Sequence, residues 1–99
     1  MVKHIIIWNF KDEYTLEEKA AYAEKIKSGL ENLINLVPGI TEIKVETAPL
    51  ASSTGDLMLD STFESIDALS AYQTNPHHVE VATFVRSVVK SRACMDYEV

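Results

Sequence analysis

The amino-acid sequence predicts an α+β fold in which helices pack against one face of a single β-sheet. Three observations support this fold class. Four segments show the apolar patterns of β-strands, two longer regions repeat apolar residues every three or four positions, and the helical segments begin at residues that cap helices. Because the chain has 99 residues, we expect one domain that spans residues 1–99.

The first predicted strand covers residues 2–10, and the first predicted helix covers residues 15–36. The continuous apolar run Ile5–Trp8 predicts a strand that is apolar on both faces. Thr15 and Glu18 match the T-x-x-E capping box, which marks a helix start. The helix then shows an apolar stripe at Leu16, Ala20, Ala23, Ile26, Leu30, Leu33 and Val37.

Two further strands are predicted in the middle of the chain. Pro38-Gly39 ends the first helix, and residues 40–47 then alternate between apolar and charged side chains, as in a strand with one wet face. Small residues with Pro and Gly make residues 48–55 a loop. Residues 56–63 read as the next strand.

The last third of the chain predicts a second helical unit that is interrupted, followed by a fourth strand. Ser65 is a suitable N-cap for a short helix with apolar positions at Ile66, Leu69 and Tyr72. Asn75-Pro76 predicts a new helix start, and this helix runs to about Ser91. Its inward stripe is formed by His78, Ala82, Val85 and Val89. Residues 93–99 alternate as a strand.

The resulting order, β-α-β-β-α-β, is that of the ferredoxin-like fold with a four-stranded antiparallel sheet. Both helical units then cover one sheet face and leave the other bare. Because the first strand is apolar on both sides, we expect a second copy of the chain to cover the open face, which gives a homodimer shaped as an α/β barrel. The alternative is that the first strand is central and the rest of the open face is polar enough for water.

Composition excludes several classes of function. The net charge is −6, with nine Lys and Arg against fifteen Asp and Glu, so we expect no binding to nucleic acid or to an anionic membrane. The apolar run near the start is too short for a signal peptide or a spanning helix. Cys94 is the single cysteine, so no intrachain disulfide can form, and we expect a cytoplasmic protein.

The candidate functional residues are His4, Tyr72 and His78. His78 lies on the inward stripe of the last helix, and His4 is predicted to face the same interior, where histidine can move protons near neutral pH. A Tyr72 hydroxyl buried beside them needs a hydrogen-bond partner, and His78 is a plausible one. The alternative is that both histidines bond to backbone carbonyls and that Tyr72 merely packs.

We expect no metal site and no cofactor. His77 and His78 are neighbours on one helix, so their side chains diverge by about 100° and do not readily share a metal. His77 is expected to face solvent. No phosphate-binding loop, dinucleotide fingerprint or zinc-ligand cysteine pair is present.

Several short segments spread over nearly the whole chain resemble the stress-responsive dimeric α/β-barrel (Dabb) family. They are Val2-Lys3-His4, Phe10-Lys11-Asp12-Glu13, Val37-Pro38-Gly39-Ile40, Phe63-Glu64-Ser65, Tyr72-x-x-x-Pro76-x-His78-Val79 and Asp96-Tyr97. The resemblance implies the fold and the dimer that the patterns predict. The family includes heat-stable stress proteins and many members without a known activity.

The family resemblance also implies roles for individual residues. One plant member is a polyketide cyclase; its catalytic histidine matches His78, its catalytic tyrosine matches Tyr72, and its pocket histidine on a strand matches His4. Arg86-Ser87 also agree with that enzyme. Two positions depart from the pattern: Val89 replaces a bulky aromatic residue, and Glu46 replaces a glycine that is common at the end of the second strand.

Three functions are therefore consistent with the sequence. The first is binding of a small apolar or polyketide-like molecule in a cavity between sheet and helices, with His78 as the acid or base and Tyr72 holding a carbonyl. The second is a non-catalytic, stress-responsive structural dimer. The third is a cofactor-free monooxygenase, an analogy from fold alone in which Trp8 is the residue to examine.

Overall fold

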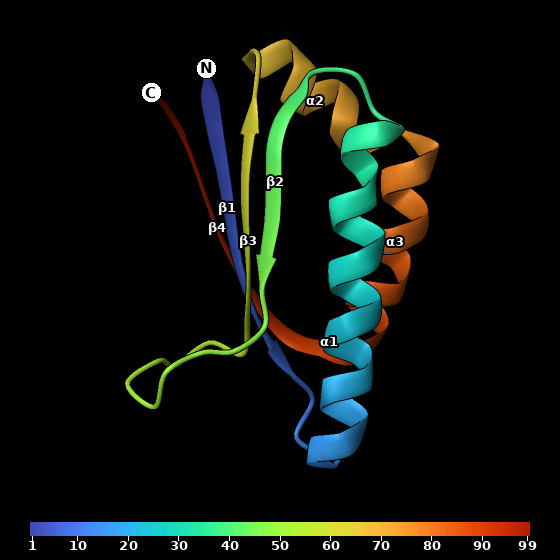
Figure 1. The fold of residues 1–99 in the computed structure, drawn as a ribbon, viewed down its shortest axis with the longest axis vertical. Coiled ribbons are helices and arrows are strands. Elements are labelled where there is room, and N and C mark those ends of the chain that lie inside the picture. Colours follow the sequence, from blue (N-terminus) through green and yellow to red (C-terminus); the bar gives the residue numbers. More distant parts are fainter.

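The computed structural model describes residues 1–99 and has two layers, a β-sheet and a layer of helices on one side of it (Figure 1). The sheet has the order β2-β3-β1-β4 with antiparallel neighbours: β1 (Val2–Phe10), β2 (Ile40–Glu46), β3 (Leu57–Phe63) and β4 (Val89–Glu98). The helices are α1 (Leu16–Glu31), a following 3₁₀ turn (Asn32–Asn35), α2 (Ile66–Thr74) and α3 (Pro76–Val88). The predicted ferredoxin-like α+β fold is confirmed.

The helix starts are where the sequence predicts them, because the capping side chains make their expected hydrogen bonds. The Thr15 hydroxyl accepts the Glu18 N–H at 3.1 Å, and the Glu18 carboxylate accepts the Thr15 N–H at 2.9 Å. Ser65 caps α2, and Asn75 caps α3 with Pro76 as its first helical residue. The Asn75 cap places His78 in the first turn of α3.

The first predicted helix is one piece in sequence but two in structure. The α-helix ends at Glu31 instead of residue 36, and residues 32–35 tighten into a 3₁₀ turn. The Leu33 carbonyl accepts both the Leu36 and Val37 N–H groups. This tighter winding brings Leu33 and Val37 into the core, where both are buried.

The end of the last helix was predicted wrongly. Helix α3 stops at Val88 instead of about Ser91, and Val89 starts β4 instead of extending the helical stripe. Val89 pairs with Phe10 in the ladder between β1 and β4, because consecutive β-branched valines suit a strand. The register then shifts: Asn9 pairs with Ser91, which leaves Lys90 as an extra residue, as in a β-bulge.

The two faces of the sheet differ as the alternation predicts. The core lies between sheet and helices, and its most deeply buried side chains include Ile26, Leu33, Leu59, Phe63 and Tyr72. On the open face, neighbouring strands form an apolar strip made by Ile5, Ile7, Met58, Met95 and Tyr97. Met95 is 67% exposed and Tyr97 is 41% exposed. An apolar strip of this kind in water marks an interaction surface.

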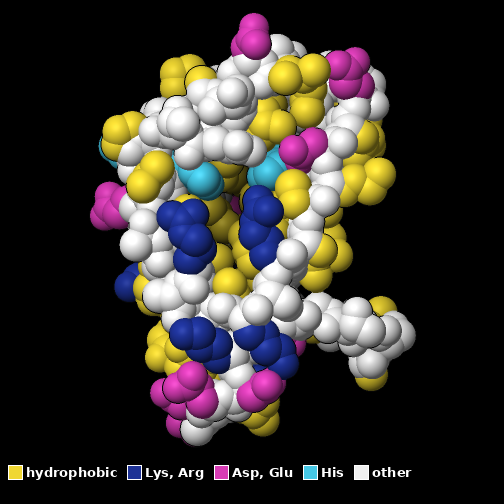
Figure 2. All heavy atoms as spheres, turned by 180° about the vertical axis from the view of Figure 1, so that it is seen from behind, with side chains coloured by type: hydrophobic (Ala, Val, Ile, Leu, Met, Phe, Trp, Pro, Cys, Tyr) yellow, Lys and Arg dark blue, Asp and Glu magenta, His cyan; other side chains and the backbone are white.

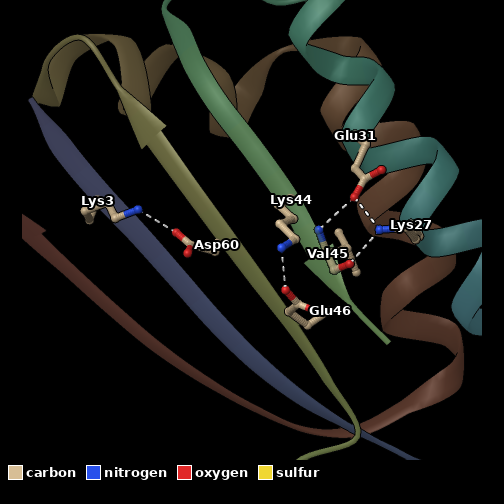
Figure 3. Close-up of polar contacts among 7 residues, drawn as sticks. All are labelled: Lys3, Lys27, Glu31, Lys44, Val45, Glu46 and Asp60. Atoms are coloured by element: carbon tan, nitrogen blue, oxygen red, sulfur yellow. Dashed lines mark hydrogen bonds and ion pairs between the residues drawn. The ribbon is translucent and has the colours of Figure 1, made fainter. Parts of the chain in front are cut away.

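Strand β2 is an edge strand, and α1 protects part of its edge (Figure 3). The Glu31 carboxylate accepts the Val45 N–H at 3.0 Å, and the Lys27 ammonium donates to the Val45 carbonyl at 2.9 Å and to Glu31 at 2.7 Å. Burial raises the pKa of Glu31, but the bonds from Lys27 and Val45 outweigh it and leave that pKa lowered. These bonds hold α1 against the sheet. They also occupy the Val45 N–H and carbonyl groups, which could otherwise pair with a strand of another chain.

None of the helices combines the length and the apolar character needed to cross a lipid bilayer.

Candidate functional site

A cavity of about 260 Å³ lies between the sheet and helices α1, α2 and α3. Its apolar wall is formed by Ile6, Trp8, Leu30, Leu59, Ala82 and Val85. Its polar side chains are those of His4, Tyr72, Gln73, His78, Arg86 and Arg92. Figure 2 shows a hollow on one face of the molecule, bordered by histidine and by Lys or Arg side chains. The three residues predicted as a site, His4, Tyr72 and His78, all line this one cavity.

Tyr72 is buried on α2, and its hydroxyl oxygen is the one buried side-chain nitrogen or oxygen atom without a hydrogen-bond partner. Burial raises the pKa of the Tyr72 phenol, so the group remains a protonated donor at neutral pH. An unpartnered buried hydroxyl costs folding free energy. A donor kept at that cost in the wall of a cavity is available to an acceptor on a ligand.

His78 is half-buried near the start of α3, and its Nδ1 lies 3.2 Å from the Gln73 carbonyl oxygen. A carbonyl oxygen only accepts, so we assign the proton of the neutral ring to Nδ1, which leaves Nε2 as the acceptor. The rings of Tyr72 and His78 are in contact, with centroids 4.1 Å apart and planes at 41°. The expected hydrogen bond between the Tyr72 hydroxyl and His78 is absent, because the two rings pack in a tilted arrangement and the His78 Nδ1 bonds to the Gln73 carbonyl instead.

The electrostatic surroundings keep His78 neutral. Burial is the main cause that lowers the pKa of His78. The Gln73 hydrogen bond raises this pKa, and the charges of Arg86 and Arg92 lower it further. A neutral imidazole with a free Nε2 can accept a proton at neutral pH.

We expect the His78 ring protons to titrate in NMR spectra with a midpoint below the ordinary value of 6.5. The unfolded chain then takes up this proton at a higher pH than the folded chain, so the stability that His78 contributes is lost as pH falls below that value. His78→Ala assigns the resonance and should remove this part of the pH dependence. A midpoint above 6.5 would show that burial and the neighbouring charges do not act on His78 as described.

His4 is buried on β1, with an exposed side-chain fraction of 2%. Its partner across the ladder is Asp96 on β4, and the His4 Nδ1 lies 2.5 Å from a carboxylate oxygen of Asp96. The His4 ring also meets Tyr72 edge to face, with centroids 6.2 Å apart. A carboxylate beside Nδ1 fixes the orientation of the ring, so Asp96 positions His4 in the cavity wall.

Sequence reasoning assigned no role to Asp96 or Cys94, although both lie beside His4. The Cys94 sulfur is 3.9 Å from the His4 Nδ1 and 3.5 Å from the Asp96 carboxylate. Nitrogen, sulfur and oxygen ligands within 4.8 Å of one another are of the types that zinc accepts. Burial, followed by the Asp96 charge, raises the pKa of Cys94 and favours the thiol over the thiolate that a metal binds. The alternation in residues 93–99 was the available signal, because it places both residues on one face.

His77 is exposed, as expected.

The sequence and structure have clear relatives. The model of the stress-responsive A/B barrel domain (Dabb) family matches residues 2–99. Olivetolic acid cyclase of Cannabis sativa is 29% identical over 99 residues, which cover 97% of this chain and 94% of the cyclase. The stress-response A/B barrel domain-containing protein HS1 of Arabidopsis thaliana is 28% identical over 103 residues, which cover 98% of this chain and 88% of that protein.

A solved structure gives the same result. A dimeric protein of unknown function with a ferredoxin-like fold from Bacteroides fragilis superimposes with a TM-score of 0.93 and is 32% identical. The match covers 99% of this chain and 95% of that one. The family resemblance expected from the sequence is therefore confirmed, and the chain belongs to the stress-responsive A/B barrel domain (Dabb) family.

Proposed function

We propose that the protein binds a small, mostly apolar molecule with a carbonyl group in the cavity beside Tyr72 and His78, and that it moves a proton at the carbon next to that carbonyl. The observation that carries this proposal is the unpartnered Tyr72 hydroxyl in the wall of the cavity. A carbonyl oxygen is an acceptor that satisfies this donor without introducing a charge. Similarity to olivetolic acid cyclase supports a polyketide-like ligand, because polyketides contain repeated carbonyl groups.

The chemistry follows from the two side chains. The Tyr72 hydroxyl donates to the carbonyl oxygen, and His78 Nε2 takes a proton from the adjacent carbon. The electron pair of the broken C–H bond forms the enolate, and its negative oxygen is stabilised by the Tyr72 hydrogen bond. In a ligand with a second carbonyl, the enolate carbon can attack that carbonyl and close a ring, and the proton on His78 can then return to the new alkoxide.

The size of the cavity limits the ligand. About 260 Å³ lies just below the usual range for ligand sites, which is about 300 to 1,000 Å³. The six apolar side chains of the wall favour a single ring or a short chain.

Replacing Tyr72 by phenylalanine tests the proposal, because it removes only the unpartnered hydroxyl. We expect this variant to unfold at a higher temperature, with a gain of about 1–3 kcal/mol, since an unsatisfied buried donor is lost. Affinity for a neutral ketone such as phenylacetone should fall by about tenfold, the value of one good hydrogen bond. Thermal unfolding followed by circular dichroism and ketone binding followed by NMR measure the two effects.

Tyr22→Phe is the matched control, because Tyr22 is half-buried in an aromatic cluster away from the cavity. That variant should keep the ketone affinity of the wild type. If Tyr72→Phe is less stable than the wild type, or binds the ketone equally well, the hydroxyl is not reserved for a ligand carbonyl and the proposal is wrong.

We also propose that the chain forms a homodimer through the apolar strip on the open sheet face. The dimeric state of the Bacteroides fragilis relative supports it, as does the exposure of Met95 and Tyr97. A homodimer without a ligand would agree with the alternative function, a non-catalytic, stress-responsive structural dimer. The cavity on the opposite side of the sheet favours a ligand-binding role in addition.

A further inference from the structure

We propose that the ligand is an organic acid, and that Arg86 and Arg92 together hold its carboxylate while Tyr72 holds its carbonyl. This inference rests on the proposed function and adds the class of ligand. Both arginines line the cavity, one from α3 and the other from β4.

The distribution of charge supports this assignment. The chain is acidic, with a net charge of −6, and its basic residues are seven lysines and only two arginines, which are Arg86 and Arg92. Every ion pair in the molecule uses a lysine or His4, so neither arginine has a carboxylate partner in the protein. No Asp or Glu lines the cavity. Both arginines are exposed and have no carboxylate partner, so their guanidinium groups are available to an anion from outside the chain.

The two arginines lie at matching positions along the cavity. On α3, Arg86 follows His78 by eight residues, which is about 12 Å along a helix axis. On the sheet, Arg92 pairs with Trp8, four residues beyond His4 on β1, which is about 13 Å along a strand. The backbones of both arginines therefore lie about two helical turns or four strand residues beyond the histidines, one on each wall, and their side-chain charges still act on His78.

The guanidinium group also fits a carboxylate better than an ammonium does. Its planar donors can form two parallel hydrogen bonds to the two oxygens of a carboxylate. Arginine side chains are long and line the cavity, so a ligand can be shorter than the distance of about 12 Å between the backbones of His78 and Arg86. An aromatic ring that bears a ketone and a carboxylate offers an acceptor to Tyr72, an anion to the arginines and an apolar middle to the wall.

The test compares three probes that differ by one group. 4-Acetylbenzoate has both the ketone and the carboxylate, 4-acetylbenzamide replaces the charge by a neutral amide, and 4-ethylbenzoate lacks the ketone. We expect the wild type to bind 4-acetylbenzoate about tenfold more tightly than the amide in calorimetry. Arg86→Gln and Arg92→Gln should each weaken the acid by about tenfold and leave the amide unchanged, because only the acid uses the guanidinium groups.

Lys90→Gln is the matched control, because it removes the same charge from β4, where Lys90 is exposed and pairs with Asp12 outside the cavity. It should keep the affinity of the wild type for all three probes. Equal binding of the acid and the amide, or an arginine variant that binds the acid as the wild type does, would overturn the inference.

The probes also separate this inference from the proposed function. If 4-ethylbenzoate binds as tightly as 4-acetylbenzoate and the arginine variants weaken both, the carboxylate site stands and the carbonyl role of Tyr72 fails. If 4-acetylbenzamide binds through Tyr72 but the acid gains nothing, the proposed function stands and the arginine site fails. If no probe binds at millimolar concentration, both are wrong.

Discussion

Replacing His78 by alanine should abolish proton transfer to and from a ketone in the cavity. The expected reaction is exchange of the hydrogens next to the carbonyl of phenylacetone for deuterium in heavy water, which NMR follows directly. A positioned general base contributes about 10²- to 10⁴-fold to such a step, and the variant should lose an effect of that size. The physical reason is that the His78 Nδ1 faces the Gln73 carbonyl, which leaves the His78 Nε2 free to accept the proton.

The neighbouring histidine provides the control for this experiment. His77 is exposed on the same helix and makes no side-chain contact with the cavity, so His77→Ala should exchange phenylacetone as the wild type does. A wild-type rate no higher than that of His78→Ala would contradict the proposed base. Thermal unfolding of both variants at equal protein concentration shows that any loss of exchange is not a loss of folding.

Replacing Met95 by glutamate should convert the proposed homodimer into monomers. Met95 is 67% exposed on the apolar strip, so the change costs the isolated chain little. In a face-to-face dimer it places carboxylates against an apolar surface, and the cost of burying an unpaired charge opposes association. We expect the dissociation constant, measured by analytical sedimentation, to rise by about 100-fold or more, which corresponds to about 2.7 kcal/mol.

Leu16→Glu is the control for dimerisation. Leu16 is a large apolar residue that is 85% exposed, but it lies at the start of α1, away from the open sheet face. That variant should remain as dimeric as the wild type. A dimeric Met95→Glu variant with unchanged affinity would show that the chain does not associate through the strip.

Much of the fold could be predicted because its signals are local. The caps at Thr15, Ser65 and Asn75 depend on residues two or three positions away, and the structure reproduces all three. The end of α3 could not be predicted in this way. Val88 and Val89 fit a helical stripe as well as a strand, and pairing of Val89 with the distant Phe10 decides between them.

The candidate site was predictable only in part, for a similar reason. Helical spacing indicated that Tyr72 and His78 face inward, and both line the cavity. The cavity itself is the volume that many side chains leave unfilled, so no single segment encodes it. Arg92 gave no signal because its face depends on the register of β4 against β1, which is set by contacts across 84 positions of sequence, from Trp8 to Arg92.

The extra residue at Lys90 determines which side chains of β4 face the cavity and which face the open side of the sheet. Beyond it, Arg92, Cys94 and Asp96 share the cavity face with Trp8, Ile6 and His4, while Met95 and Tyr97 lie on the open face. Because side chains alternate, a strand without this residue would present the opposite set on each face. A single-codon deletion here would move the arginine outward and the methionine inward, so one change in chain length would damage ligand recognition and assembly together. We therefore expect evolution to vary the side chains of this segment far more freely than its length.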